Sequence, residues 1–127
     1  LNNTDEMISS IDRNFNIVTI NSANRKRILE RYGKEPKIGM NVLDFVDKST
    51  IPTLKEIFNQ IIQKRRNHFH HLFKVDSDQG VLFYDTWLRP LSVDNEIFGI
   101  SIFVNDITQR LLNKKALQDS ENRLKRI

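Results

Sequence analysis

The sequence predicts an α+β domain in which one antiparallel β-sheet is covered on one face by helices and is followed by a C-terminal connector helix. Three β-rich runs, at 68–75, 81–90 and 96–105, are joined by short turns, which is typical of an antiparallel meander. An apolar stripe at helical spacing precedes them at 53–66, and an amphipathic helical pattern follows them from Asp106. A chain of 127 residues can bury one such core.

The first two strands are expected at 7–12 and 17–20, where β-branched residues are frequent. The segment between them, 12–16, is predicted to form a tight turn, with Asn14 or Asn16 as the residue most tolerant of a positive φ. Two short strands are not stable alone, so we expect them to join the sheet formed by the other three.

A first helix is predicted over 21–32, with Asn21 as the N-cap whose side-chain oxygen accepts from a backbone N–H of the first turn. Gly33 is suited to the left-handed conformation that ends many helices. Pro36 forbids continuation of this helix, and 41–46 can form one short helical turn.

The clearest helix covers 53–66, and Pro52 suits its first turn. Its apolar residues recur at i, i+3, i+4, i+7 and i+8: Leu54, Ile57, Phe58, Ile61 and Ile62. The later strands alternate with period 2, which predicts two rows of residues that each share one face of a strand. These are Phe69, His71, Phe73 and Val75 on one strand, and Phe98, Ile100, Ile102 and Val104 on the other.

The terminal helix is expected to begin at Asp106, whose carboxylate can accept from N–H groups near Thr108 and favours the positive end of the helix dipole. Its apolar residues are Leu111, Leu117, Leu124 and Ile127, with one heptad between the second and third. This pattern leaves two alternatives open, a coiled coil with a second copy or a helix that packs back on its own domain. Because the pattern still runs at the last residue, we expect a longer parent protein.

Composition restricts the function further. The chain has no cysteine, which excludes disulfides, thiolate nucleophiles and cysteine-ligated metal sites. Its net charge is +4, and residues 106–127 hold six Lys or Arg against three Asp or Glu, which indicates a solvated helix and not a nucleic-acid surface. No apolar run is long enough to cross a membrane. We expect a cytoplasmic domain without membrane contact, although the parent protein can be membrane-anchored elsewhere.

Catalytic and metal sites find little support in the sequence. His68 and His70 share one face of a strand while His71 points to the other, so three ligands cannot converge from this strand and no metal is expected. The four glycines are not clustered into a phosphate-binding loop, and no catalytic triad can be assigned. We therefore expect no enzymatic activity in this chain.

The order of these motifs resembles a PAS domain over nearly the whole chain. Residues 12–21 with Ala23 resemble the family's opening hairpin and its Asn-x-Ala helix start, and Gly39 with 42–46 resembles the segment after the first helix. Further along, the resemblance covers the fourth strand (80–91), the last strand with its Asp-Ile-Thr exit motif (99–108) and the linker helix found in sensor histidine kinases (116–124).

The sequence departs from the family pattern at three places. Phe15 stands where the family usually has a turn glycine, and the segment from Tyr32 to Gly39 is shorter than usual. Tyr84 stands about where many members carry tryptophan, with Trp87 displaced along the strand.

The resemblance implies a sensory PAS domain over 1–108 and the start of a signalling linker helix over 109–127. It implies a signal relayed through Asp106, Ile107 and Thr108 to a downstream output domain, with a histidine kinase expected first and a diguanylate cyclase or other effector as the alternative. A small ligand-carrier or an enzyme of α+β type is the alternative from another class. A parallel homodimer through the terminal helix is expected.

PAS domains bind haem, flavin or small metabolites between helices and sheet, so the resemblance places a small-molecule pocket there. Its candidate residues are Phe58, Ile62, Phe73, Trp87 and Ile102. The flavin-adduct and photoactive-chromophore subclasses need a cysteine, and residues 53–66 contain no His that could ligate haem. These three cofactors are disfavoured, non-covalent flavin stays open, and the cofactor is left unassigned.

Overall fold

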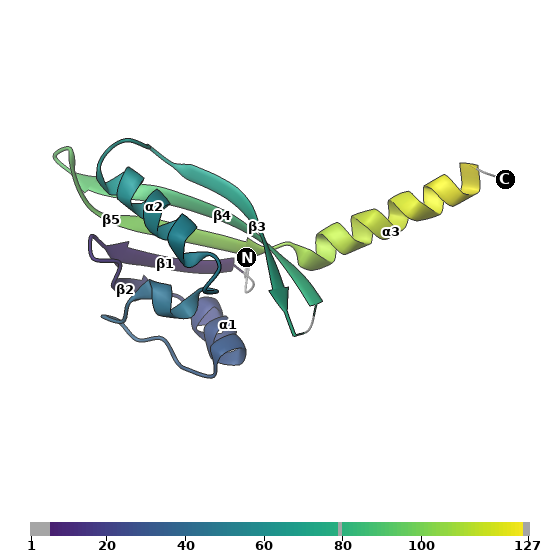
Figure 1. Cartoon of the computed structure of the whole chain (residues 1–127), viewed down its shortest axis with the longest axis horizontal. Coiled ribbons are helices and arrows are strands. Elements are labelled where there is room, and N and C mark those ends of the chain that lie inside the picture. Colours follow the sequence, from purple (N-terminus) through teal and green to yellow (C-terminus); the bar gives the residue numbers. More distant parts are fainter. Residues whose placement is uncertain (1–5, 79, 126–127) are drawn as a thin grey trace.

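A computed structural model describes residues 6–78 and 80–125, and it contains one five-stranded antiparallel sheet with strand order β2-β1-β5-β4-β3 (Figure 1). Three helical elements lie over one face of the sheet, and the last helix projects away from the body. The elements are β1 (Glu6–Asp12), β2 (Ile17–Ile20), α1 (Ser22–Tyr32), η1 (Val42–Phe45), α2 (Ile51–Ile62), β3 (Phe69–Ser77), β4 (Gly80–Val93), β5 (Glu96–Asp106) and α3 (Thr108–Lys125). The predicted fold class is confirmed.

The turn between β1 and β2 corrects one expectation. Phe15, and neither asparagine, takes the positive φ, at 69°. The Asp12 carboxylate holds this turn by accepting from the backbone N–H of Asn14 at 2.9 Å and of Asn16 at 3.0 Å. The Phe15 ring is buried against Phe58, with ring centroids 5.2 Å apart. Core burial therefore offsets the backbone strain that a glycine would avoid.

The entry to α1 is built as predicted, and it also fastens the helix to the sheet. The Asn21 side-chain oxygen accepts from the backbone N–H of Asn24 at 3.0 Å and of Ile8 at 3.1 Å. Its amide nitrogen donates to the carbonyl of Glu6 at 2.9 Å. Gly33 ends the helix in the left-handed region with φ 68°, as expected.

The core lies between α2 and the middle of the sheet. Ile57, Phe58 and Ile61 are the buried residues of α2, and they pack in one cluster with Leu88 and Ile100 from the central strands. The helix begins two residues earlier than predicted and ends four residues earlier. It stops at Ile62 because Lys64 adopts φ 61°, outside the helical range.

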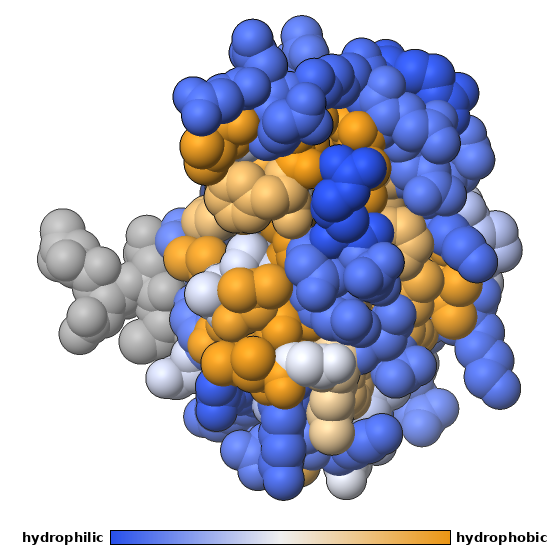
Figure 2. Space-filling model, turned by 90° about the vertical axis from the view of Figure 1, so that its left-hand side faces the viewer, coloured by the Kyte–Doolittle hydropathy of each residue, from blue (hydrophilic) through white to orange (hydrophobic). Residues whose placement is uncertain are grey.

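In the predicted row of β5, Ile100, Ile102 and Val104 pack in or against the core. The placement of Phe98 in this row is wrong: the β4–β5 pairing passes from Gly99 to Ile97 without it, so the alternation shifts, Ile97 is buried and Phe98 is 51% exposed. The β4–β5 turn, at 94–95, lies at the left end of Figure 1. Figure 2 looks at this end and shows hydrophobic surface interleaved with hydrophilic surface.

Helix α3 leaves the domain and does not pack back on it (Figure 1). Every described residue from Leu112 to Lys125 is exposed, including Leu117 and Leu124. Within the described residues 107–125, only Ile107, just before the helix, is buried. Among the described helices, none combines the length and apolar character that crossing a membrane requires.

Candidate functional site

A cavity of about 160 Å³ lies between the helices and the covered face of the sheet. We call it the sheet–helix cavity. Its wall is mostly apolar, with side chains from all three covering elements and from every strand except β2. The apolar lining is Met7, Ile28, Val42, Phe45, Val46, Leu54, Phe58, Phe73, Val75, Leu88, Ile102 and Val104, and the polar lining is Ser9, Asn24, Arg27, Arg31, Tyr32, Asp47, Thr50, Tyr84 and Thr86.

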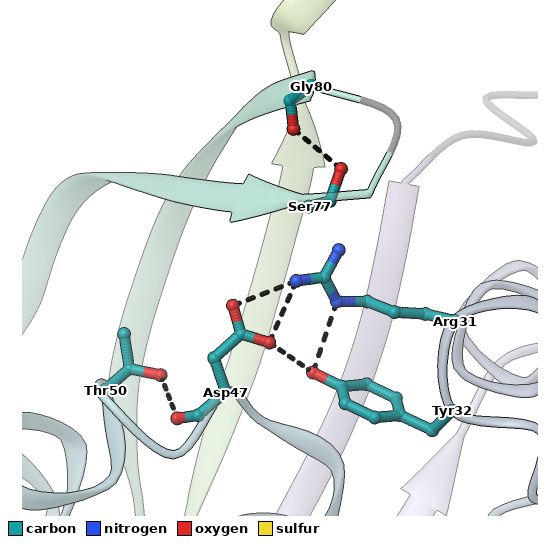
Figure 3. Close-up of polar contacts among 6 residues, drawn as sticks. All are labelled: Arg31, Tyr32, Asp47, Thr50, Ser77 and Gly80. Carbon is teal, nitrogen blue, oxygen red and sulfur yellow. Dashed lines mark hydrogen bonds and ion pairs between the residues drawn. The ribbon is translucent and has the colours of Figure 1, made fainter.

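One polar part of the wall is a cluster at the end of α1 (Figure 3). The terminal nitrogen Nη2 of Arg31 donates to both carboxylate oxygens of Asp47, at 2.8 and 2.9 Å. The Tyr32 hydroxyl donates to the same carboxylate at 3.0 Å, and the Thr50 hydroxyl donates to the Asp47 carbonyl at 2.7 Å. The cluster joins α1 to the segment that leads into α2.

Burial and pairing set the protonation of this cluster. Burial alone would lower the pKa of Arg31, but the hydrogen bonds and negative charge of Asp47 outweigh it, so the pKa lies above its ordinary value. Burial raises the pKa of Tyr32 above 10.0, although the hydrogen bond from Arg31 acts in the opposite direction. At neutral pH, the Arg31 guanidinium is therefore charged and the Tyr32 hydroxyl beside it is neutral.

Tyr84 lies between this cluster and the exit helix. It is directly opposite Asp106 in the β4–β5 pairing, and its side chain lines the cavity. Burial raises the pKa of Tyr84, while the positive charges of Arg27 and Arg31 partly counteract the rise. The Tyr84 hydroxyl is thus neutral at neutral pH, and it interacts electrostatically with the arginines of α1 and with Asp106 and Asp47.

The start of α3 is fixed by Asp106. Its Oδ1 accepts from the Thr108 backbone N–H at 3.0 Å and from the Thr108 hydroxyl at 2.5 Å, which confirms the predicted partner. Its other oxygen, Oδ2, forms an ion pair with Arg27 of α1. The Arg27 side chain is 41% exposed, whereas that of Asp106 is 12% exposed.

Two further bonds fasten the same junction to β4. The Ile107 N–H donates to the Phe83 carbonyl at 3.0 Å, and the Phe83 N–H donates to the Thr108 hydroxyl oxygen at 2.8 Å. The first turn of α3 is therefore held by β4, by the end of β5 and, through Arg27, by a cavity-lining residue of α1.

The structure places three of the five candidate pocket residues in the cavity wall and two outside it. Phe58, Phe73 and Ile102 line the cavity, whereas Ile62 and Trp87 do not. The expected inward placement of Trp87 is wrong, because its neighbours Thr86 and Leu88 face inward and alternate residues of a strand face opposite sides.

Trp87 instead lies on the uncovered face of the sheet. Its ring stacks on His70 with centroids 4.4 Å apart and meets Phe103 edge-on at 5.6 Å. His70 also bonds to Asp85 through its Nε2, at 2.6 Å. In the described ranges, 6–78 and 80–125, no three His, Asp or Glu side chains are placed to hold a metal ion.

Sequence reasoning missed the polar cavity residues of α1. Asn24, Arg27, Ile28 and Arg31 recur at i, i+3, i+4 and i+7, so they occupy one helix face. A search for apolar periodicity passes over this face because three of its four residues are polar. The i, i+3, i+4, i+7 spacing of these residues was the signal in the sequence that could have placed them on one helix face.

Comparison with known proteins agrees with this architecture. A family model described as the PAS fold matches residues 1–112. The PAS domain of BvgS from Bordetella pertussis is similar in structure, with a TM-score of 0.69 and 18% identity over 94% of this chain and 89% of that one. A sensory box sensor histidine kinase from Vibrio cholerae aligns with a TM-score of 0.62 and 13% identity, covering 81% and 82% of the two chains.

A third similar structure is the PAS domain of the Cronobacter turicensis quorum-sensing receptor RpfR in complex with BDSF. It has a TM-score of 0.59 and 16% identity, and covers 85% of this chain and 99% of that one. At these identities the likeness shows the fold. No protein with a curated description matches the chain.

Proposed function

The chain belongs to the PAS family, and we propose that it is a sensory module that binds a small molecule in the sheet–helix cavity and relays binding through α3 to an output domain. One observation carries the proposal. Arg27 lines the cavity and is also the ion-pair partner of Asp106, the residue that holds the first turn of α3. A ligand that changes the position of Arg27 therefore acts on the exit helix through one contact.

The relay needs only a modest energy. A ligand shifts an equilibrium between two arrangements by its difference in affinity for them. The bonds at the Asp106 junction contribute energies on the order of 1 kcal/mol each. An output poised between two states changes severalfold under a shift of about that size.

A histidine kinase is the output we favour, because structurally similar domains belong to sensor histidine kinases. A diguanylate cyclase or another effector is the alternative, and a small ligand-carrier or an α+β enzyme is the alternative from another class.

The exposed Leu112, Leu117 and Leu124 favour a parallel homodimer through α3. Light scattering should show dimers at rising concentration, and a monomer at millimolar concentration contradicts this part. We place the module in the cytoplasm.

The test joins α3 in heptad phase to a histidine kinase core and measures autophosphorylation. Leu54→Phe enlarges a cavity-lining side chain of α2 and should change the basal activity severalfold. Leu72→Phe makes the same change at an exposed position of β3, outside the cavity, and serves as the matched control. If both folded variants retain wild-type activity, the cavity is not coupled to the output.

A further inference from the structure

We propose that the ligand of the sheet–helix cavity is a small monocarboxylate with a compact apolar body, and that Arg27 binds its carboxylate. The inference rests on the proposed function, because it names the chemistry of the molecule sensed. Three properties of the wall support it: an unbalanced charge, donor capacity on Arg27 and the size of the apolar space.

The charges of the lining do not balance within the cavity. Two arginines, Arg27 and Arg31, and one aspartate, Asp47, are among the lining residues. Arg31 and Asp47 compensate each other through two hydrogen bonds. Arg27 is paired with Asp106, which is not among the lining residues. The charge of Arg27 is therefore compensated from outside the lining, by one carboxylate at one nitrogen, and a ligand with one negative charge can bind to the same guanidinium from the cavity side.

Arg27 has the capacity to hold a second carboxylate. A guanidinium group carries five N–H donors. In the part of the chain that the structure describes, Arg27 gives one contact, from Nη2 to Asp106. Its side chain is partly exposed and hence less constrained than that of Arg31. Guanidinium and carboxylate groups bind in a forked geometry that uses two donors, so Arg27 can engage a ligand with its remaining nitrogens.

The other lining residues determine the size and the apolar character of the ligand body. Phe58, Leu88 and Ile102 are buried apolar residues that line the cavity. The volume of about 160 Å³ is close to that of an engineered apolar cavity of about 150 Å³ that binds benzene. A body of about six to eight carbon atoms fits this space.

Binding of this kind couples directly to the exit helix. A ligand carboxylate at the remaining nitrogens of Arg27 shares the guanidinium with Asp106. Asp106 then keeps its bonds to Thr108, while the contact with Arg27 that joins α3 to α1 shifts with the guanidinium. The occupied cavity thus differs from the empty one at the first turn of α3, which is the element proposed to carry the signal.

The experiment compares phenylacetate with its uncharged analogue phenylacetamide, using the whole 127-residue chain, calorimetry and backbone amide chemical shifts. Phenylacetate should bind about 10- to 100-fold more tightly, the range expected for a hydrogen bond between charged groups. Arg27→Met should abolish this preference, and Arg27→Lys should retain part of it. Lys26→Met removes the same charge from an exposed position of α1 and should keep the full preference.

Each outcome bears on the inference. Equal affinity for the acid and the amide, or a preference that survives Arg27→Met, overturns it. If the amide alone shifts the cavity amides, the ligand class is wrong while small-molecule sensing stands. If neither compound binds, the inference fails, and the kinase fusion with Leu54→Phe decides separately whether the cavity controls output. Arg27→Lys keeps the test decisive if the methionine variant does not fold.

Discussion

Replacement of Asp106 by alanine should loosen the start of α3 by about 1–3 kcal/mol while the sheet stays folded. The substitution removes the acceptor for the Thr108 N–H and hydroxyl and the partner of Arg27. Loss of a side-chain cap costs about 0.5–2 kcal/mol. Loss of an ion pair with a partly exposed partner adds about 0.2–1 kcal/mol. The backbone pairing of Asp106 with Tyr84 does not depend on the side chain and should persist.

Two further variants divide this energy into its parts. Asp106→Asn keeps an oxygen acceptor for the Thr108 N–H but loses the charge, so it should cost only the share of the ion pair. A double-mutant cycle between Asp106→Ala and Arg27→Met measures that share independently. The two estimates should agree to within a few tenths of a kcal/mol.

Amide hydrogen exchange is the assay that separates a local effect from a global one. The Leu111 N–H bonds to the Ile107 carbonyl in the first turn of α3. Its protection should fall roughly tenfold for each 1.4 kcal/mol lost. The Ile100 amide, in the buried middle of β5, should keep its protection. Wild-type protection at Leu111 refutes the reasoning, and so does an equal loss at both amides. In the kinase fusion, the same variant should change basal output severalfold.

Three more predictions concern the body of the domain. Gly99→Ala should destabilise the domain by about 3 kcal/mol, the upper end for overpacking, because the new Cβ would lie 2.3 Å from the Ile11 carbonyl oxygen. Urea unfolding measures this loss, and the control Ser101→Ala should lower the free energy of unfolding much less. Because burial raises the folded pKa of Tyr84 above 10.0, its contribution to stability should be complete below that pH and be lost as pH rises through the folded value. Tyr84→Phe should flatten this alkaline loss in thermal unfolding, and an unchanged slope contradicts the assignment. Phe58→Ala, at a position 2% exposed, should cost about 3–5 kcal/mol by the same urea assay, and a cost below 1 kcal/mol would place Phe58 outside the core.

Bonds between near neighbours were predictable from sequence. The Asn21 side chain reaches Asn24 and the Asp106 side chain reaches Thr108, which are separations of three and two residues. At such separations the backbone geometry of a helix start fixes the partner, so residue type and spacing suffice. The strand alternation of β5 over 100–104 and the strongly apolar face of α2 were predictable for the same reason, since each follows one local period.

Contacts between distant segments were decided by the tertiary structure. Arg27 and Asp106 are 79 positions apart, and Arg31 and Asp47 are 16 apart. No local period relates such residues, so their meeting depends on how α1 packs against the sheet. The positive φ of Phe15 has the same origin, because only the burial of its ring against α2 makes that strained conformation favourable.

The sequence by itself therefore determined the order of the elements, their caps and the exit motif, whose interactions lie within a few residues of one another. The tertiary structure decided which face of β4 carries Trp87, because a shift of one residue reverses a strand and nothing in the long aromatic run fixes the register. It also decided that the cavity has a charged wall. Long polar side chains line this cavity only because their partners, from other elements, satisfy their charges once the layers have packed together.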